Sequence, residues 1–299
     1  MAKPILFDPV ESPYLVGFDD TFKISKADTK PPDDAPGKKE NIAALEETVQ
    51  KLTKVQGQLY ADNRYAVLLV FQAMDAAGKD GTIKAVMSGV NPQGCQVYAF
   101  KKPSDEDVDH DFLWRIQRDL PERGRIGIFN RSHYEEVLAV RVHPEFLERQ
   151  RLPRQPKDLD ELWDERFQSI VEAERHWARN GIVVLKFFLN VSQREQHDRF
   201  LDRIVDPDNN WKFSVADWVE TQKWDDYMAA YQAALRATSK PWAPWYAVPA
   251  DSKSFMRRTV AELIVATLDK LPLAYPTAPA EERTQMEKIR RQLEAERTK

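Results

Sequence analysis

Residues 65–83 read YAVLLVFQAMDAAGKDGTI, and this stretch decides the fold. Its first part, residues 65–71, is an unbroken apolar run, which is typical of a strand buried on both faces of a parallel sheet. The second part resembles the pattern G-x-x-x-x-G-K-[ST], in which backbone N–H groups and a lysine hold phosphate oxygens. The stretch therefore predicts a strand, a phosphate-binding loop and a helix in succession.

The loop departs from that pattern at two positions and carries an unusual carboxylate. Gly78 and Lys79 stand where they are expected, but Ala73 replaces the first glycine and Asp80 replaces the magnesium-binding hydroxyl. Asp75 lies inside the loop, where a carboxylate is costly beside phosphates unless a divalent cation lies between them. The loop therefore favours a phosphate site that includes a metal ion.

Composition bounds the class of protein. The chain has 299 residues, 42% of them hydrophobic, which is enough for one large domain. A net charge of −4 argues against nucleic-acid binding by bulk charge, although 44 Lys and Arg residues allow a local basic patch. The single cysteine, Cys95, indicates a reducing compartment, and no stretch approaches the roughly 20 apolar residues of a membrane span. We expect a cytoplasmic protein without nucleic-acid or membrane partners.

Five apolar segments alternate with helical patterns along the chain. The expected strands are residues 65–71, 96–100, 126–129, 182–189 and 245–248. The expected helices between and around them include residues 41–60, 78–88, 159–178, 191–205 and 255–271. Such alternation predicts an α/β fold with a parallel sheet and helices on both faces.

Two more helices are expected from local signals. Ser104 is a good N-cap for a helix that runs through Asp107 to Trp114. Aromatic residues spaced from Trp218 to Tyr231 predict one long helix whose aromatic side chains lie in the core or in an interface.

Basic residues stand at two further places where phosphates could bind. Asn130 and Arg131 end the third strand, at a position where phosphate-loop proteins normally have an aspartate that holds magnesium. Arg199 and Arg203 are four residues apart and therefore share one helix face. Such a face is often only solvated surface, but late in a chain of this kind it is also typical of a lid over phosphates.

Five ordered blocks of sequence resemble the polyphosphate kinase 2 family, a branch of the P-loop kinases. The blocks are MDAAGKDG at 74–81, KKP at 101–103 with HDFLWR at 110–115, FNRSHY at 129–134, RF at 199–200 with WKF at 211–213, and WAPWY at 242–246. The resemblance implies a P-loop kinase-like three-layer α/β/α sandwich with a five-stranded parallel sheet and a helical lid. It also implies phosphoryl transfer from inorganic polyphosphate to a nucleotide, with Mg²⁺ or Mn²⁺, by a cytoplasmic homodimer or homotetramer.

One variant block points to a subgroup. Most members of the family end the third strand in Asp-Arg-Ser-Trp-Tyr, whereas residues 130–136 here read NRSHYEE. This variant resembles class III of the family, which implies ADP and AMP, and also GDP and GMP, as phosphoryl acceptors that yield ATP and GTP. Because Asn130 lacks a carboxylate, Glu135 or Glu136 is the candidate for a second metal ligand.

The resemblance assigns roles to individual residues. The expected catalytic residues are Asp75, Lys79 and Arg131, and Asp75 is also the expected metal ligand. The residues expected to bind nucleotide or polyphosphate are Ala76, Ala77, Gly78, Asp80, Gly81, Thr82, Lys101, Asn130, Arg199, Arg203 and Lys212. The expected domain organisation is an extended arm over residues 1–40, a P-loop kinase domain over 41–273 with its lid at about 191–215, and a charged C-terminal helix over 274–299.

Three other interpretations stay open at this point. The chain could be a nucleoside monophosphate kinase that uses ATP as donor, although Asp75 and the missing hydroxyl after Lys79 argue against it. It could also be a non-catalytic P-loop module that binds polyanions, or an inactive regulatory subunit. Retention of Asp75, Lys79 and Arg131 disfavours the last.

Overall fold

A computed structural model describes residues 7–154, 158–208 and 210–297. Residues 1–6 of the expected arm, residue 209 of the expected lid and residues 298–299 of the expected C-terminal helix lie outside the described residues.

One parallel sheet forms the centre of the molecule, with strand order β2-β3-β1-β4-β5. The strands are β1 (Ala66–Gln72), β2 (Cys95–Ala99), β3 (Ile126–Asn130), β4 (Ile182–Asn190) and β5 (Trp245–Pro249). All residues of β1 are buried, and Leu69 pairs with Ile128 on one side and Leu185 on the other. The expected five-stranded parallel sheet is confirmed. The apolar run of β1 fits its central place, because a strand that is covered on both faces has no side chains in contact with water.

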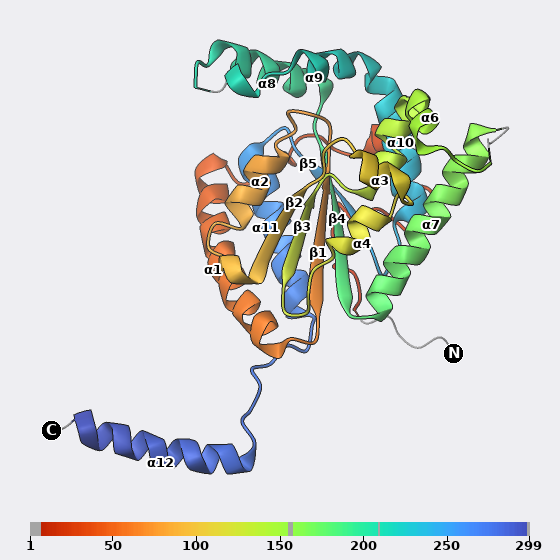
Figure 1. Ribbon diagram of the computed structural model, residues 1–299. Helices are drawn as coiled ribbons and strands as arrows, with labels where there is room; N and C mark the ends of the chain where they lie inside the picture. Colours follow the sequence, from red (N-terminus) through yellow and green to blue (C-terminus); the bar gives the residue numbers. More distant parts are fainter. Residues whose placement is uncertain (1–6, 155–157, 209, 298–299) are drawn as a thin grey trace.

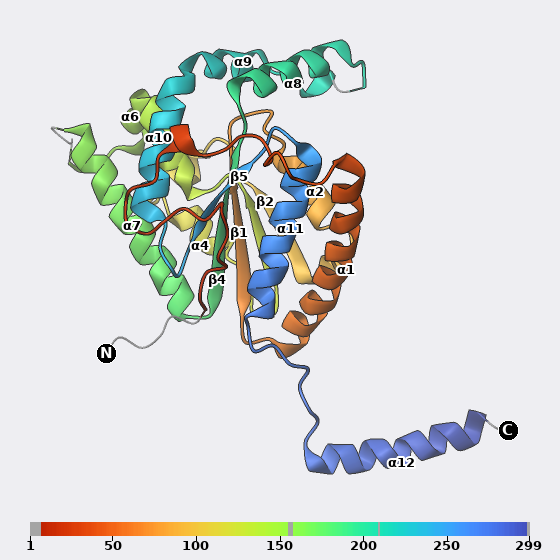
Figure 2. The same cartoon turned by 180° about the vertical axis from the view of Figure 1, so that it is seen from behind.

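Helices cover both faces of this sheet, as Figures 1 and 2 show. On one face pack α1 (Lys38–Asp62), α2 (Lys79–Val86) and α11 (Lys253–Asp269), and on the other α7 (Leu159–Arg179) and α10 (Trp224–Thr238). The shorter helices and 3₁₀ turns are η1 (Ile24–Lys26), η2 (Pro92–Gly94), α3 (Asp105–Asp109), α4 (Trp114–Arg118), η3 (His133–Glu136), α5 (Ala139–Val142), η4 (Pro144–Phe146), α6 (Leu147–Gln150) and η6 (Thr221–Lys223). The three-layer α/β/α sandwich is thereby confirmed.

Two segments lie outside the sandwich. The helices α8 (Gln193–Val205) and α9 (Val215–Glu220), with η5 (Asn210–Lys212) between them, lie above the end of the sheet to which the phosphate loop belongs (Figure 1). The helix α12 (Ala280–Arg297) extends away from the body of the molecule, and none of its residues is buried. No helix among the described residues has the length and apolar character that crossing a bilayer requires.

Two expected helices are interrupted in the structure. The helix expected from Ser104 to Trp114 is wrong as a single element, because the backbone is extended at His110 and Asp111 then accepts a hydrogen bond from the N–H of Leu113. The long helix expected through Trp218 and Tyr231 is likewise divided into α9, η6 and α10. At His110 and Asp111, local side-chain hydrogen bonds override the continuous periodicity. At the second break, η6 and α10 begin without a side-chain cap.

The N-terminal segment covers the edge of the sheet formed by β5. The N–H of Val16 donates to Trp245 O (2.9 Å), and the N–H of Ala247 donates to Tyr14 O (2.8 Å). Leu15 forms an isolated antiparallel bridge with Tyr246. These contacts satisfy backbone groups that an open sheet edge would leave exposed.

A buried polar network fixes the turn η3 that follows β3. Lys186 Nζ donates to Glu174 Oε2 (2.6 Å), to Tyr134 Oη (2.8 Å) and to Thr238 O (2.8 Å), and the Lys186 and Glu174 side chains are fully buried. His133 is also buried, with Nε2 3.5 Å from Glu174 Oε1. Because the network joins η3 to β4, α7 and α10, it orients the neighbouring Arg131 and Glu135.

Burial of His133 predicts a loss of stability in mild acid. Burial lowers the pKa of His133 below its ordinary value, so the unfolded chain binds a proton below about pH 6.5 while the folded chain does not. Stability therefore falls as pH falls below that point, by at most about 1.4 kcal/mol per pH unit for this one proton. Thermal unfolding of wild type and His133→Phe between pH 5 and 8 measures it; equal slopes in both proteins would contradict the expectation.

Candidate active site

The phosphate loop connects β1 to the N-terminus of α2. Ala76 has φ 61° and Gly78 has φ 105°, both in the left-handed region. Alternation of this kind turns successive backbone N–H groups toward one concave side, and the helix dipole of α2 adds positive potential there. Lys79 Nζ lies inside the loop, 2.7 Å from Ala73 O. Burial lowers the pKa of the Lys79 ammonium, and Asp75 opposes that shift.

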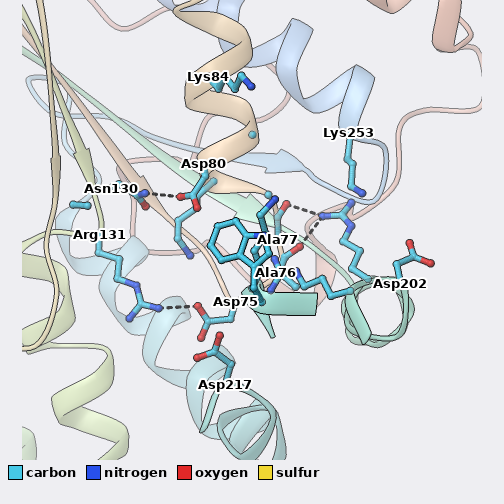
Figure 3. A pocket seen from close by; sticks show the side chains of 18 of the residues that line it. Asp75, Ala76, Ala77, Asp80, Lys84, Asn130, Arg131, Asp202, Asp217 and Lys253 are labelled. Atoms are coloured by element: carbon cyan, nitrogen blue, oxygen red, sulfur yellow. Dashed lines mark hydrogen bonds and ion pairs between the residues drawn. The ribbon is translucent and has the colours of Figure 1, made fainter. Parts of the chain in front are cut away.

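A cavity of about 990 Å³ opens in front of the loop (Figure 3). Of the described residues that line it, ten are Lys or Arg and five are Asp. The expected site residues among them are Asp75, Ala76, Ala77, Gly78, Lys79, Asp80, Gly81, Lys101, Asn130, Arg131, Arg199, Arg203 and Lys212. The cavity therefore has the size and the positive charge that a chain of phosphates requires.

Among the residues expected to bind nucleotide or polyphosphate, only Thr82 does not line this cavity. Its side chain is buried, its hydroxyl donates to Gly78 O (2.9 Å), and its N–H also donates to Gly78 O (3.0 Å). Both of its donors are therefore used within the first turn of α2, so Thr82 supports the loop instead of facing the phosphates.

Arg131 and Asp75 form an ion pair in the cavity. Arg131 Nη2 lies 2.7 Å from Asp75 Oδ1. A dashed line marks this ion pair in Figure 3. Arg131 has φ 63°, and its N–H donates to Phe71 O (3.1 Å), so the backbone turns sharply at the end of β3. Glu135 and Asp75 raise the pKa of Arg131 above its ordinary value, so the guanidinium is a permanent cation here. The pair places a fixed positive charge beside the expected metal ligand.

Asp80 of the loop and Asn130 at the end of β3, which both depart from the usual P-loop residues, contact each other. Asn130 Nδ2 donates to Asp80 Oδ1 over 2.6 Å. A carboxylate at position 130 would face the Asp80 carboxylate, and like charges at this distance oppose each other. The Asn130 amide, in place of the usual aspartate, therefore stabilises the Asp80 carboxylate, which stands in place of the usual hydroxyl. The sequence did not reveal this contact, because the two residues lie in separate motifs.

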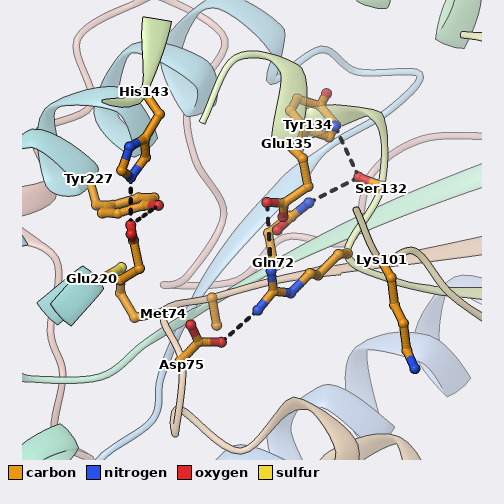
Figure 4. A network of polar contacts seen from close by, with 12 residues as sticks. Gln72, Met74, Asp75, Lys101, Ser132, Tyr134, Glu135, His143, Glu220 and Tyr227 are labelled. Atoms are coloured by element: carbon orange, nitrogen blue, oxygen red, sulfur yellow. Dashed lines mark hydrogen bonds and ion pairs between the residues drawn. The ribbon is translucent and has the colours of Figure 1, made fainter. Parts of the chain in front are cut away.

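The structure distinguishes the two glutamates that follow. Glu136 is buried, and its Oε2 accepts from Gln150 Nε2 (2.7 Å) and Arg166 Nη1 (3.1 Å), away from the cavity. Glu135 instead lies beside Arg131, with Oε2 4.0 Å from Arg131 Nη1, and contacts the amide of Gln72 (Figure 4). Burial raises the pKa of Glu135, while Arg131 and Lys79 oppose that shift. Of the two, only Glu135 pairs with a residue that lines the cavity, Arg131.

Paired substitutions test this distinction. Glu136→Ala leaves the buried Arg166 without its carboxylate, so we expect about 3 kcal/mol less stability with unchanged kcat of the folded protein. Glu135→Gln removes a charge beside Arg131, so we expect a lower kcat with little change in the unfolding midpoint. Thermal unfolding and steady-state rates on both variants decide, and an exchange of the two outcomes would contradict the assignment.

Several cavity residues were not singled out by sequence reasoning. They are Lys84, Lys102, Asp202, Asp206, Asp217, Lys253 and Arg257. Lys253 and Arg257 are four apart at the start of α11, a spacing that could have drawn attention to them. No sequence pattern pointed to Asp217, because only the tertiary structure brings α9 close enough for Asp217 to face Asp75 (Figure 3). Burial raises the pKa of Asp217, and the charge of Asp75 adds to that shift.

The donor set fits a magnesium ion that is bound mainly by substrate. Among residues 7–154, 158–208 and 210–297, no three His, Cys, Asp or Glu side chains form a metal-binding group. Mg²⁺, however, usually takes one or two carboxylates and completes its shell with phosphates and waters. Asp75 and Asp217 face each other in the cavity and satisfy that requirement (Figure 3). The site is therefore suited to a metal that arrives with phosphates.

The sandwich, the phosphate loop and the basic cavity define a phosphotransferase of the P-loop class. The family model described as polyphosphate kinase 2 matches residues 36–274. The chain is 49% identical to an ADP-polyphosphate phosphotransferase of Rhodopseudomonas palustris, over 94% of this chain and 97% of that protein. It therefore belongs to the polyphosphate kinase 2 family, and the expected family and enzyme class are confirmed.

Two further proteins are similar over most of their length. An AMP/ADP-polyphosphate phosphotransferase of Meiothermus ruber is 40% identical, over 88% of this chain and 94% of that protein. The crystal structure of polyphosphate kinase 2 from Arthrobacter aurescens superposes with a TM-score of 0.83 at 35% identity, over 94% of this chain and 99% of that chain. The fold and the family therefore agree.

Proposed function

We propose that this protein transfers the terminal phosphoryl group of inorganic polyphosphate to ADP and AMP, and also to GDP and GMP. The observation that carries the proposal is the Asp75–Arg131 ion pair in front of the phosphate loop, in a cavity lined by ten Lys and Arg among the described residues. So many positive charges suit a long polyanion better than the three phosphates of a nucleoside triphosphate. The names of the R. palustris and M. ruber relatives support ADP and AMP as acceptors.

The roles follow from where charge develops during the reaction. Phosphoryl transfer needs alignment of the attacking and leaving oxygens and compensation of charge on the transferred group. Lys79 and the N–H groups at the start of α2 hold the transferring phosphates. Arg131 lies where it can compensate charge on the equatorial oxygens. Lys101, Arg203 and Lys212 also line the cavity and would hold the rest of the polyphosphate.

A divalent cation belongs to this proposal. Asp75, with Asp217 opposite it, would hold Mg²⁺, for which Mn²⁺ could substitute, and Glu135 would hold Arg131 beside them. The metal, when bound, neutralises charge on the phosphate oxygens. The proposal further includes a homodimer or homotetramer in the cytoplasm, with residues 41–273 as the catalytic domain and about 191–215 as its lid, as the family resemblance implies.

The acceptors are tested by product analysis. Purified protein is incubated with Mg²⁺, polyphosphate and, one at a time, AMP, ADP, GMP or GDP, and the nucleotides are separated by chromatography. We expect ATP from ADP, ADP followed by ATP from AMP, and the matching guanine products. Products that form only when ATP is added would instead support the nucleoside monophosphate kinase interpretation.

A further inference from the structure

The carbonyl groups of the phosphate loop are held from behind by two side chains of α8. Gln196 Nε2 donates to Asp75 O (2.9 Å). Arg199 Nη1 donates to Ala76 O (3.1 Å) and to Ala77 O (2.7 Å). Three successive carbonyls of the loop therefore point toward α8.

This direction of the carbonyls matters for anion binding. In a loop with Ala76 at φ 61° and Gly78 at φ 105°, outward carbonyls and inward N–H groups are two sides of the same conformation. An L-residue such as Ala76 adopts the left-handed region only at a cost, so the conformation needs support from its surroundings. Gln196 and Arg199 supply hydrogen bonds that exist only in this conformation.

Arg199 has no N–H group left for a phosphate. Its side chain is buried, and besides the two loop carbonyls it donates from Nη2 to Ala250 O (2.6 Å) and Asp251 O (3.5 Å) and from Nε to Glu195 Oε1 (2.7 Å). A guanidinium has five N–H groups, and these five acceptors use all of them. The expectation that Arg199 contacts polyphosphate is therefore not supported by the geometry. Arg203, one turn farther along α8, also lines the cavity.

We propose that Gln196 and Arg199 are positioning residues that keep the N–H groups of the phosphate loop turned toward the phosphates. The proposal rests on the proposed function, since the phosphates are those of polyphosphate and nucleotide. It also assigns the first two turns of α8 to the fixed part of the site.

The test uses changes in charge to distinguish a residue that positions the loop from one that contacts phosphate directly. Gln196→Met removes the hydrogen bond to Asp75 O without changing any charge. Arg199→Lys keeps the positive charge but loses the planar guanidinium, and Arg199→Met removes both. Arg203→Met removes a cation that faces the cavity. Arg194→Met, an exposed residue of the same helix, is the matched control. For each variant we measure the unfolding midpoint, kcat and KM, and the affinity for polyphosphate as a function of salt.

We expect Gln196→Met, Arg199→Lys and Arg199→Met to lower kcat at least tenfold while the slope of log affinity against log salt stays that of wild type. Arg203→Met should make that slope shallower, because one ion contact fewer releases fewer counterions, as for other polyanions. Arg194→Met should match wild type throughout. Wild-type kcat in Gln196→Met, or a shallower salt slope in Arg199→Met equal to that of Arg203→Met, would overturn the proposal.

Calorimetric binding of inorganic tripolyphosphate separates this proposal from the proposed function. Binding requires no turnover, and we expect Gln196→Met to bind at least tenfold more weakly than wild type. If wild type binds tripolyphosphate but transfers no phosphoryl group, the proposed function fails while the positioning role stands. If Gln196→Met binds as wild type does, the positioning role fails whatever the activity.

Discussion

Arg131→Ala lowers kcat by about 10³-fold, the range in which arginines that stabilise phosphoryl transfer act. The expectation follows from the position of Arg131, whose guanidinium pairs with Asp75 over 2.7 Å and faces the cavity in front of the loop. Without Arg131, the charge on the transferred group loses this cation. Because the loss concerns the transition state more than the bound substrates, KM for ADP should change less than kcat.

Two further variants make the Arg131 result interpretable. Arg131→Lys keeps a positive charge but loses the planar fork, so we expect an intermediate rate. Arg141→Ala, a partly buried arginine that pairs with Asp160 outside the cavity, controls for the loss of any arginine near this segment. Initial rates under saturating Mg²⁺ measure all three. A loss confined to KM in Arg131→Ala would show that Arg131 binds substrate without stabilising the transition state.

Lys79→Met lowers kcat by about 10²- to 10³-fold, the usual cost of removing one preorganised charge-stabilising donor. The ammonium lies within the loop, 2.7 Å from Ala73 O, at the N-terminus of α2. Methionine has a similar length but carries no charge and no donor, so the phosphates lose their cation and Ala73 O loses its hydrogen bond. The unfolding midpoint should therefore change by only a few degrees.

Lys54→Met provides the matched control for Lys79→Met. Lys54 is an exposed lysine of α1, outside the cavity, and its substitution removes the same charge from the protein. Rates and circular dichroism are compared for the two variants and wild type. Activity of Lys79→Met within threefold of wild type would show that the loop does not carry the transferring phosphates.

Much of the fold could be predicted because its signals are local. The apolar run of β1 and the residues Gly78 and Lys79 specify strand, loop and helix within one continuous stretch. The alternation of four further apolar segments with helices then allows few arrangements of a parallel sheet. The break at His110 escaped this reasoning, because a local side-chain hydrogen bond can end a helix inside an otherwise continuous pattern. The break between α9 and α10 escaped it as well, and no side-chain cap marks it.

Only those site residues that belong to recognisable sequence motifs could be predicted. Asp75, Lys79 and Arg131 belong to contiguous blocks, and the fold brings them together at the same end of the sheet. Periodicity placed Arg199 and Arg203 on one helix face but could not tell that Arg199 is buried against the loop. Asp217 comes from a helix beyond the sheet, so only the tertiary structure places it opposite Asp75.

The most direct test of the account follows phosphorus nuclei during the reaction. Protein, ADP, Mg²⁺ and polyphosphate are mixed without any nucleoside triphosphate, and ³¹P resonances are recorded over time beside a Lys79→Met sample. The account predicts ATP resonances that grow as internal polyphosphate signal declines, with one phosphoryl group lost per ATP formed and no matching AMP. Unchanged polyphosphate, or ATP that appears only together with an equal amount of AMP, would contradict polyphosphate as the phosphoryl donor.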